Sequence, residues 1–172
     1  MKTGDVEIMM NSAKETLGYC CLVGCLLFAS CAKSNNEPQQ VLFQTVENAS
    51  ESHTQITNGI HVLRSVTEWS DFWSILKTSY IPQPPLPSVN FSEKVVIAVV
   101  DSSRATGGYS ITITRVQISA AGLVIQAVHQ SPGPACLVTQ APSQPYHIVT
   151  APAFSGEATL WLTETVLDCS PP

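Results

Sequence analysis

The residues from Lys94 to Val100 limit the fold of this chain more than any other segment. They read KVVIAVV, so six consecutive apolar side chains follow the lysine, and most of them are β-branched. A short run of this kind is typical of a strand that is buried on both faces. We therefore expect it to be a central strand of a sheet.

The segments around this strand predict a β-rich domain. Residues 109–118 alternate between two faces, and Ala120-Ala121-Gly122 predicts a hairpin turn that leads into an antiparallel partner at 123–128. Other strands are expected at 41–46, 55–63, 147–150 and 158–165, with a turn or bulge at Asn58-Gly59, a polar stretch at 47–53, and a pairing of the last two strands through 154–156. The predicted fold class is α+β, mainly β: an antiparallel sheet or sandwich of about six or seven strands with one helix packed against it.

The one predicted helix follows Ser65. Ser65-Val66-Thr67-Glu68 has the form of a capping box. Apolar side chains then recur at helical spacing: Trp69, Phe72, Trp73 and Leu76. Such a stripe packs on a sheet far more often than it forms a ligand platform. The prolines of 81–87 end the helix and predict an extended connector, either a stiff surface loop or a segment that binds a partner's aromatic groove.

A polar, glycine-containing loop follows the central strand. It reads DSSRATGGYS from Asp101 to Ser110. Paired glycines allow positive φ or a close approach of another backbone, and the flanking arginine and tyrosine can supply contacts. The candidate partner-binding residues are Arg104, Thr106, Gly107, Gly108 and Tyr109. The alternative is a tight bulge whose glycines satisfy geometry alone, with Tyr109 packed inward.

The six cysteines fall into two groups. Cys20, Cys21, Cys25 and Cys31 belong to the first part of the chain, and only Cys136 and Cys169 lie in the expected domain. Two cysteines in an exported domain predict one disulfide, which would tie the end of the last strand to the loop before the preceding strand. Two unpaired buried thiols are the alternative.

The first thirty residues predict export. Residues 17–29 form an uncharged run that is too short to span a bilayer and suits a signal peptide. The run ends in Leu27-Phe28-Ala29-Ser30-Cys31, which resembles the lipobox of bacterial lipoproteins. That resemblance implies a signal peptide at 1–30, a lipid on Cys31 and a membrane location, in the outer membrane where a cell has two, because Ala32 follows the cysteine. Cys25 is a second lipobox candidate, and a buried or membrane-anchoring helix is the alternative interpretation.

The rest of the chain is expected to be a polar tether at 31–40 and a single β-rich domain at 41–172. Acidic side chains outnumber basic ones from Cys31 onward. The sequence has no cluster of basic residues of the kind that binds nucleic acid. The four histidines show no metal spacing, and no nucleophile elbow or phosphate loop occurs. We therefore expect no enzyme, no metal and no cofactor.

Four segments in order resemble the PrcB C-terminal domain family over about residues 55–153. They are Leu86–Ser92, Val95–Val100, Arg104–Ile111 and Pro145–Val149, and the pairs Glu68-Trp69 and Phe72-Trp73 resemble the family's helix. Asn90 stands where the family pattern usually has Asp. The family is named for a lipoprotein subunit of a surface protease complex, so the resemblance implies an accessory role that binds or stabilises a protein partner, such as a protease. A peptidase inhibitor that uses the Arg104–Ser110 loop is the alternative, and a purely structural envelope protein is a weaker one.

Overall fold

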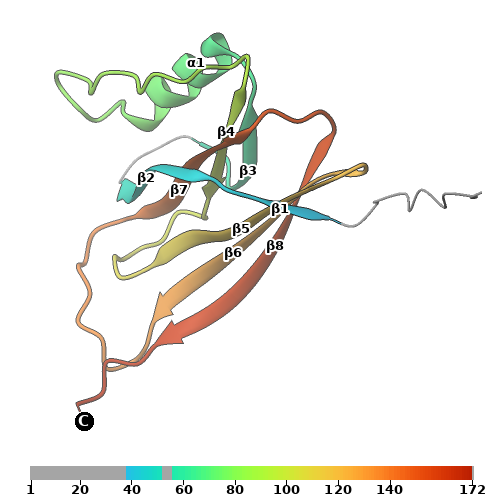
Figure 1. The fold of residues 1–172 in the computed structure, drawn as a ribbon. Coiled ribbons are helices and arrows are strands. Elements are labelled where there is room, and N and C mark those ends of the chain that lie inside the picture. Colours follow the sequence, from blue (N-terminus) through green and yellow to red (C-terminus); the bar gives the residue numbers. More distant parts are fainter. Residues whose placement is uncertain (1–37, 52–55, 172) are drawn as a thin grey trace, which may run out of the picture. The chain divides into compact units, whose positions relative to one another are not determined.

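The computed structural model describes residues 38–51 and 56–171; the predicted signal peptide, Cys31 and most of the predicted tether lie outside these residues. Two four-stranded sheets and one helix make up the described part (Figure 1). The first sheet has the order β2-β7-β4-β3, and the second has the order β1-β5-β6-β8. The elements are β1 (Gln39–Val41), β2 (Gln44–Glu51), β3 (Gly59–Leu63), α1 (Val66–Leu76), β4 (Lys94–Val100), β5 (Ser110–Ser119), β6 (Gly122–Pro132), β7 (Gln144–Pro152) and β8 (Glu157–Leu167). The predicted mainly β class with one helix is confirmed, with eight strands among the described residues.

Strand β4 lies inside the first sheet, between β7 and β3, as its apolar run predicts. Its side chains alternate between two cores. Val95, Ile97 and Val99 point into the core between the two sheets, where they meet Ile111, Ile113 and Ile125 among others. Val96, Ala98 and Val100 point to the opposite face, which α1 covers. The first sheet is therefore a middle layer, which explains why β4 has no polar face.

Helix α1 forms as the capping pattern predicts. Ser65 has extended backbone dihedrals, and its hydroxyl accepts a hydrogen bond from the Glu68 backbone N–H at 3.2 Å. The Glu68 carboxylate accepts instead from the Arg64 N–H, one residue before the cap, at 2.6 Å. The predicted stripe is buried against β4 and β7, so its packing role is confirmed: Trp69, Phe72, Trp73 and Leu76.

The proline-rich connector lies along α1. The indole N–H of Trp69 donates to the Pro87 carbonyl at 2.9 Å, and that of Trp73 donates to the Pro84 carbonyl at 3.1 Å. Extended proline segments leave their carbonyls free to accept such bonds. The tryptophans of the chain's own helix therefore bind this segment, and the stiff-loop interpretation fits its position.

The predicted pairing of the last two strands is wrong. β7 pairs with β4 on one side and β2 on the other, so it has no free edge for β8. β8 instead joins the second sheet and runs parallel to β6, from Gly122–Glu157 to Pro132–Leu167. The turn at 154–156 thus carries the chain from one sheet to the other rather than closing a hairpin.

The first two strands also differ from expectation. β1 begins at Gln39, two residues before the predicted start of the domain, and pairs with β5 in the second sheet. β2 then pairs with β7 in the first sheet and continues to Glu51, through residues predicted as a polar stretch. An edge strand tolerates this polar sequence because its apolar side chains Val46 and Ala49 pack against the core under α1, while Asn48 and Ser50 are exposed.

His147 joins the two sheets. This buried side chain of β7 accepts a hydrogen bond at Nδ1 from the backbone N–H of Ile113 in β5, at 2.8 Å. Its Nε2 lies 3.0 Å from the Thr45 hydroxyl of β2. The Ile113 N–H lies where the β5–β6 register shifts, so the imidazole bonds a backbone group beside an irregularity of the ladder. Only a neutral imidazole can accept there.

The stability of the domain is expected to fall on mild acidification because of His147. Burial lowers the pKa of His147 below its ordinary value of 6.5. The unfolded chain therefore binds more protons than the folded chain below pH 6.5, and the free energy of unfolding decreases as the pH falls from there. Denaturant unfolding between about pH 7.5 and about pH 5 measures this loss. The His147→Gln variant, which keeps an acceptor, should lose less over the same range; an equal loss would contradict the role of His147.

Candidate functional site

The loop after β4 is built around Asp101, which is buried. Its carboxylate accepts two hydrogen bonds from Arg104, from Nε and from Nη2, each at 2.9 Å. It also accepts from the Ser102 N–H at 2.7 Å. The hydrogen bonds from Arg104 to Asp101 raise the pKa of Arg104, so the guanidinium keeps its charge. The bidentate pair fixes the plane of the guanidinium as well as its position.

Tyr109 and His129 complete a stack with this arginine. The Arg104 guanidinium lies 4.9 Å from the centre of the Tyr109 ring, and the rings of Tyr109 and His129 are 6.0 Å apart at an interplanar angle of 18°. His129 is buried, and its Nε2 lies 3.1 Å from the Asp101 carboxylate. Arg104 remains 30% exposed, and Tyr109 is also partly exposed. The two partly exposed side chains of the loop are therefore held by two buried ones.

A second loop supports the glycines. Gly107 donates its N–H to the Thr139 carbonyl, and Arg104 exchanges two backbone hydrogen bonds with Ser143. Gly108 has φ of +89°, and a Cβ built there would lie 2.6 Å from Val138 Cγ1. Both reasons to place glycine here, positive φ and close approach, therefore apply. The interpretation of the loop as a tight bulge therefore explains why Gly107 and Gly108 are glycines. That interpretation also placed Tyr109 inward, but the side chain of Tyr109 is partly exposed.

A hollow of about 320 Å³ adjoins this loop. Its walls come from β2, the glycines and the second loop: Ser50, Glu51, Gly107, Gly108, Tyr109, Thr139, Ala141, Pro142 and Ser143. Of the predicted binding residues, Gly107, Gly108 and Tyr109 line it. Arg104 reaches it only through its stack on Tyr109, and Thr106 uses its carbonyl to accept from the Ser143 hydroxyl.

The loop that the peptidase-inhibitor alternative would insert into a protease cleft is held rigidly in place. Here the Arg104 guanidinium is bound to Asp101, and the backbone of Arg104 is bound to Ser143. Asp101 and His129, which position the stack, were not among the predicted residues.

A buried lysine cluster at the end of α1 was not predicted either. Lys77 is 3% exposed, and its ammonium lies 2.7 Å from carboxylate oxygens of both Glu47 and Glu51 on β2. It also donates to the Tyr146 hydroxyl, and the Tyr80 hydroxyl donates to Glu51. Burial opposes the charge of Lys77, but the hydrogen bonds and charges of the two glutamates outweigh it and raise the pKa of Lys77. The cluster fastens the end of the helix to the edge of the first sheet.

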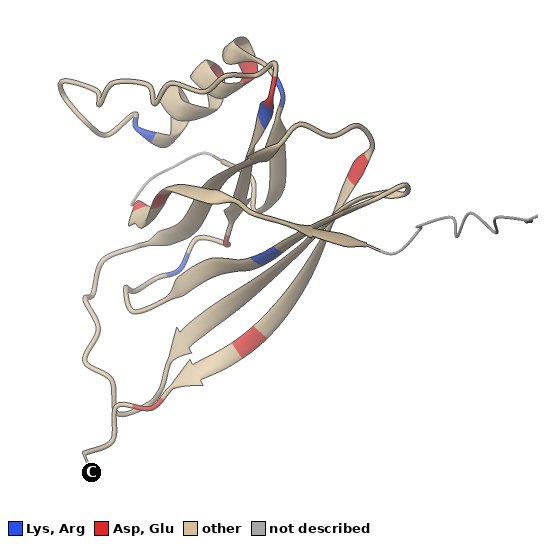
Figure 2. Ribbon diagram, viewed as in Figure 1, with Lys and Arg blue, Asp and Glu red and all other residues tan. Residues whose placement is uncertain are grey.

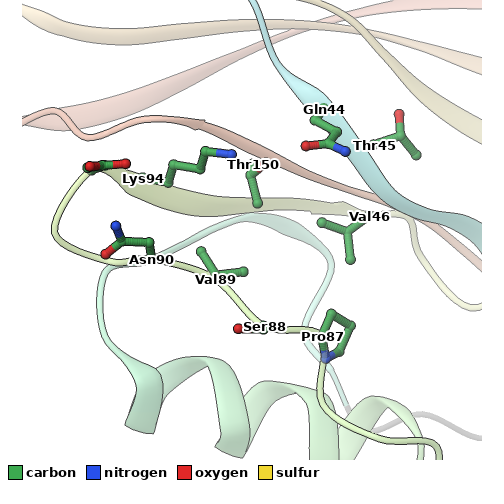
Figure 3. Close-up of a pocket in the computed structure, with 10 residues that line it drawn as sticks. Gln44, Thr45, Val46, Pro87, Ser88, Val89, Asn90, Lys94 and Thr150 are labelled. Atoms are coloured by element: carbon green, nitrogen blue, oxygen red, sulfur yellow. The ribbon is translucent and has the colours of Figure 1, made fainter.

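A groove of about 390 Å³ runs between β2 and the connector that follows α1 (Figure 3). Gln44, Thr45 and Val46 form one side, and Pro87, Val89 and Asn90 belong to the other. Asn90 accepts from the Ser92 N–H at 3.2 Å and hydroxyl at 2.7 Å, which closes a turn that an aspartate would close equally well. The groove is lined by one acidic residue, Glu93, and one basic residue, Lys94. None of the predicted site residues lines it.

The predicted disulfide is present. Cys136 in the loop between β6 and β7 is bonded to Cys169 beyond β8, 33 residues away. Gly133, near Cys136, also donates its backbone N–H to Leu167 at the end of β8. The bond thus holds the last strand to the loop that supports Gly107 and Gly108.

Removing the disulfide should destabilise the domain substantially. For a loop of 33 residues, the entropy of closure predicts a loss of about 4 kcal/mol in the free energy of unfolding for the double variant Cys136→Ser, Cys169→Ser. Denaturant unfolding of the variant and of the reduced parent chain should give the same loss. A change below about 1 kcal/mol would mean that the bond adds little to the fold.

The fold and the loop define a mainly β domain of two sheets with a helix on one of them. Residues 95–152 match the model of the family described as PrcB C-terminal. The match runs from β4 through the Gly107-Gly108 loop to the end of β7, so the resemblance seen in the sequence is confirmed over these residues, and 55–94 lie outside it. Comparisons with curated proteins and with solved structures gave no match.

The described residues carry few charges, and several of these lie in the Lys77 cluster and the Asp101–Arg104 pair (Figure 2). No three His, Cys, Asp or Glu side chains within 38–51 and 56–171 are grouped so that they could hold a metal ion. In the same ranges, no helix has the length and apolar character needed to cross a membrane.

Proposed function

We propose that this chain is a membrane-tethered accessory protein of the bacterial cell envelope whose β domain holds a protein partner, a protease or a subunit of its complex. The observation that carries the proposal is the match of residues 95–152 to the PrcB C-terminal model, since the family name refers to a protease-complex subunit. The role is one of binding and stabilising, without catalysis. Attachment through a lipid on Cys31 and an outer-membrane location are part of the same proposal.

The partner site is proposed to be the Arg104–Tyr109 stack and the hollow beside it. Arginine and tyrosine are enriched among the residues that dominate binding at protein interfaces. Asp101 and His129 hold both side chains in place, so little side-chain entropy is lost when a partner binds. The stack also lies within the matched residues, whereas the groove of Figure 3 is lined largely by residues before 95.

Affinity purification of the full chain from solubilised membranes tests this proposal. The parent chain should recover a protease subunit, and Tyr109→Ala should reduce its recovery about tenfold or more. Arg104→Lys keeps the positive charge but loses the flat guanidinium, so it should also reduce recovery. Arg115→Lys makes the same change at an exposed arginine of β5 and serves as the matched control.

Two results would count against the proposal. If no stable partner is recovered with the parent chain, the accessory role is contradicted. If Arg104→Lys and Arg115→Lys recover the partner equally well, and Tyr109→Ala does so too, binding occurs elsewhere on the domain.

A further inference from the structure

Strand β8 is an edge strand that lacks the usual protection against pairing. It has eleven residues and no lysine, proline or bulge, and within residues 38–51 and 56–171 it pairs only with β6. The other edges are shorter or interrupted: β1 has three residues, β3 has five, and β2 has a register shift between Thr45 and Glu47. Proteins commonly protect long edges with such devices, because an open edge recruits another strand.

The backbone of β8 offers alternate residues to the open side. Leu167 accepts from the Gly133 N–H, so its carbonyl faces β6. Since successive residues of a strand point their N–H and C=O groups to opposite sides, Leu162, Glu164 and Val166 present theirs to the open edge. Figure 1 shows the second half of β8 continuing beside β6 toward the C-terminus, and none of the strands that the structure describes lies on its outer side.

Large apolar side chains are exposed along the same stretch. Trp161 is 61% exposed and Val166 is 67% exposed, and Leu162 and Leu167 are also exposed. Both faces of this half-strand are therefore open, in contrast to Ala158 and Leu160, which pack against the core between the sheets. An edge strand binds another strand through hydrogen bonds of its unpaired backbone groups and through contacts of its exposed side chains. The second half of β8 offers both.

We propose that β8 pairs antiparallel with β8 of a second copy of this chain, in a register centred on Leu162. In this register Trp161 lies opposite Thr163 and Thr159 lies opposite Thr165, and twofold symmetry forms each pair twice. Aromatic–β-branched and Thr–Thr pairs are favourable across strands. The sequence of β8 thus complements itself.

The charges of β8 fit the same register. Glu157 and Glu164 are its only charged residues (Figure 2). The register places Glu164 opposite Leu160 and Glu157 opposite Leu167, so no carboxylate faces another. A register centred on Glu164 would bring two carboxylates together, which disfavours it. The proposed dimer joins the two second sheets into one continuous sheet.

This inference goes beyond the proposed partner binding. β8 lies after the residues that match the family, and the Arg104–Tyr109 stack lies within them. The dimer belongs to this chain itself and does not depend on a protease.

Cysteine cross-linking of the full chain in isolated membranes tests the dimer. Leu162→Cys places two cysteines directly opposite each other, whereas two copies of Thr165→Cys are six residues, or roughly 20 Å, apart along the strands. Cys136 and Cys169 are already paired, and the proposed export removes Cys20, Cys21 and Cys25 and places a lipid on Cys31, so the exported parent chain offers no free thiol to the reagent. A short bismaleimide should convert Leu162→Cys to a species of twice the mass and leave Thr165→Cys and the parent chain as monomers.

A backbone variant distinguishes strand pairing from chance proximity. Glu164→Pro removes an N–H that faces the open edge, so it spares the β6–β8 pairing but breaks the dimer. Added to Leu162→Cys, it should reduce the cross-linked species at least tenfold, while Glu164→Ala should not. The proposal is overturned if Leu162→Cys forms no self-adduct, if it forms one with a different protein instead, or if Glu164→Pro leaves the yield unchanged. None of these results requires a bound partner.

Discussion

Replacing Lys77 by methionine should lower the free energy of unfolding by about 3–5 kcal/mol. Methionine fills a similar volume, so the loss reports the missing charge rather than a cavity. The ammonium of Lys77 lies between Glu47 and Glu51, and both Lys77 and Glu51 are buried. Without it, Glu51 keeps the hydroxyls of Tyr80 and Tyr146 as donors, but its buried carboxylate charge has no positive partner among the residues that the structure describes.

A second substitution separates this charge effect from lost packing. Glu51→Gln removes the carboxylate charge but keeps an oxygen for the tyrosine hydroxyls. The double variant Lys77→Met, Glu51→Gln should therefore be more stable than Lys77→Met alone, with a coupling of about 1–3 kcal/mol. Denaturant unfolding of the parent, both single variants and the double variant measures it. Additive losses would contradict the ion-pair account.

Gly108→Val should destabilise the domain by about 4 kcal/mol, the sum of two effects of similar size. A β-branched residue at φ of +89° is strained by about 1–3 kcal/mol. The new side chain also meets Val138 and Pro132 of the supporting loop, and overpacking of this kind costs about 1–3 kcal/mol. Denaturant unfolding measures the sum.

Ser103→Val introduces the same side chain at an exposed position of the same loop and is the matched control for Gly108→Val. It should change the free energy of unfolding by less than about 0.5 kcal/mol. If Gly108→Val proves as stable as Ser103→Val, the loop does not require glycine at this position. If Gly108→Val remains folded and still binds its partner, the loop is dispensable for binding as well.

Local patterns were sufficient to predict the central strand and the helix. The apolar run of β4 and the stripe from Trp69 to Leu76 each reflect burial within a single element, which sequence periodicity records. Local patterns could not predict that β8 belongs to the second sheet. It depends on whether β7 has a free edge, and both of its edges are occupied by β4 and β2, which are distant in the sequence.

The exposed loop of the candidate site could be predicted from the sequence, but the buried residues that support it could not. The paired glycines and the flanking Arg104 and Tyr109 are visible as a loop motif. Asp101 is only three residues from Arg104, but its role requires that it be buried, and His129 reaches the loop from β6. The Lys77 cluster combines α1, β2 and β7, so no local signal indicates that this lysine is buried.

Photo-cross-linking from position 109 in living cells tests the central claim most directly. A benzoylphenylalanine in place of Tyr109 should form a covalent adduct with a protease or a subunit of its complex, identifiable by mass spectrometry. The same amino acid in place of the exposed Arg115 should form little of that adduct. If position 109 forms no adduct with another protein, or both positions form the same adducts equally, this chain does not hold a partner at the Arg104–Tyr109 stack.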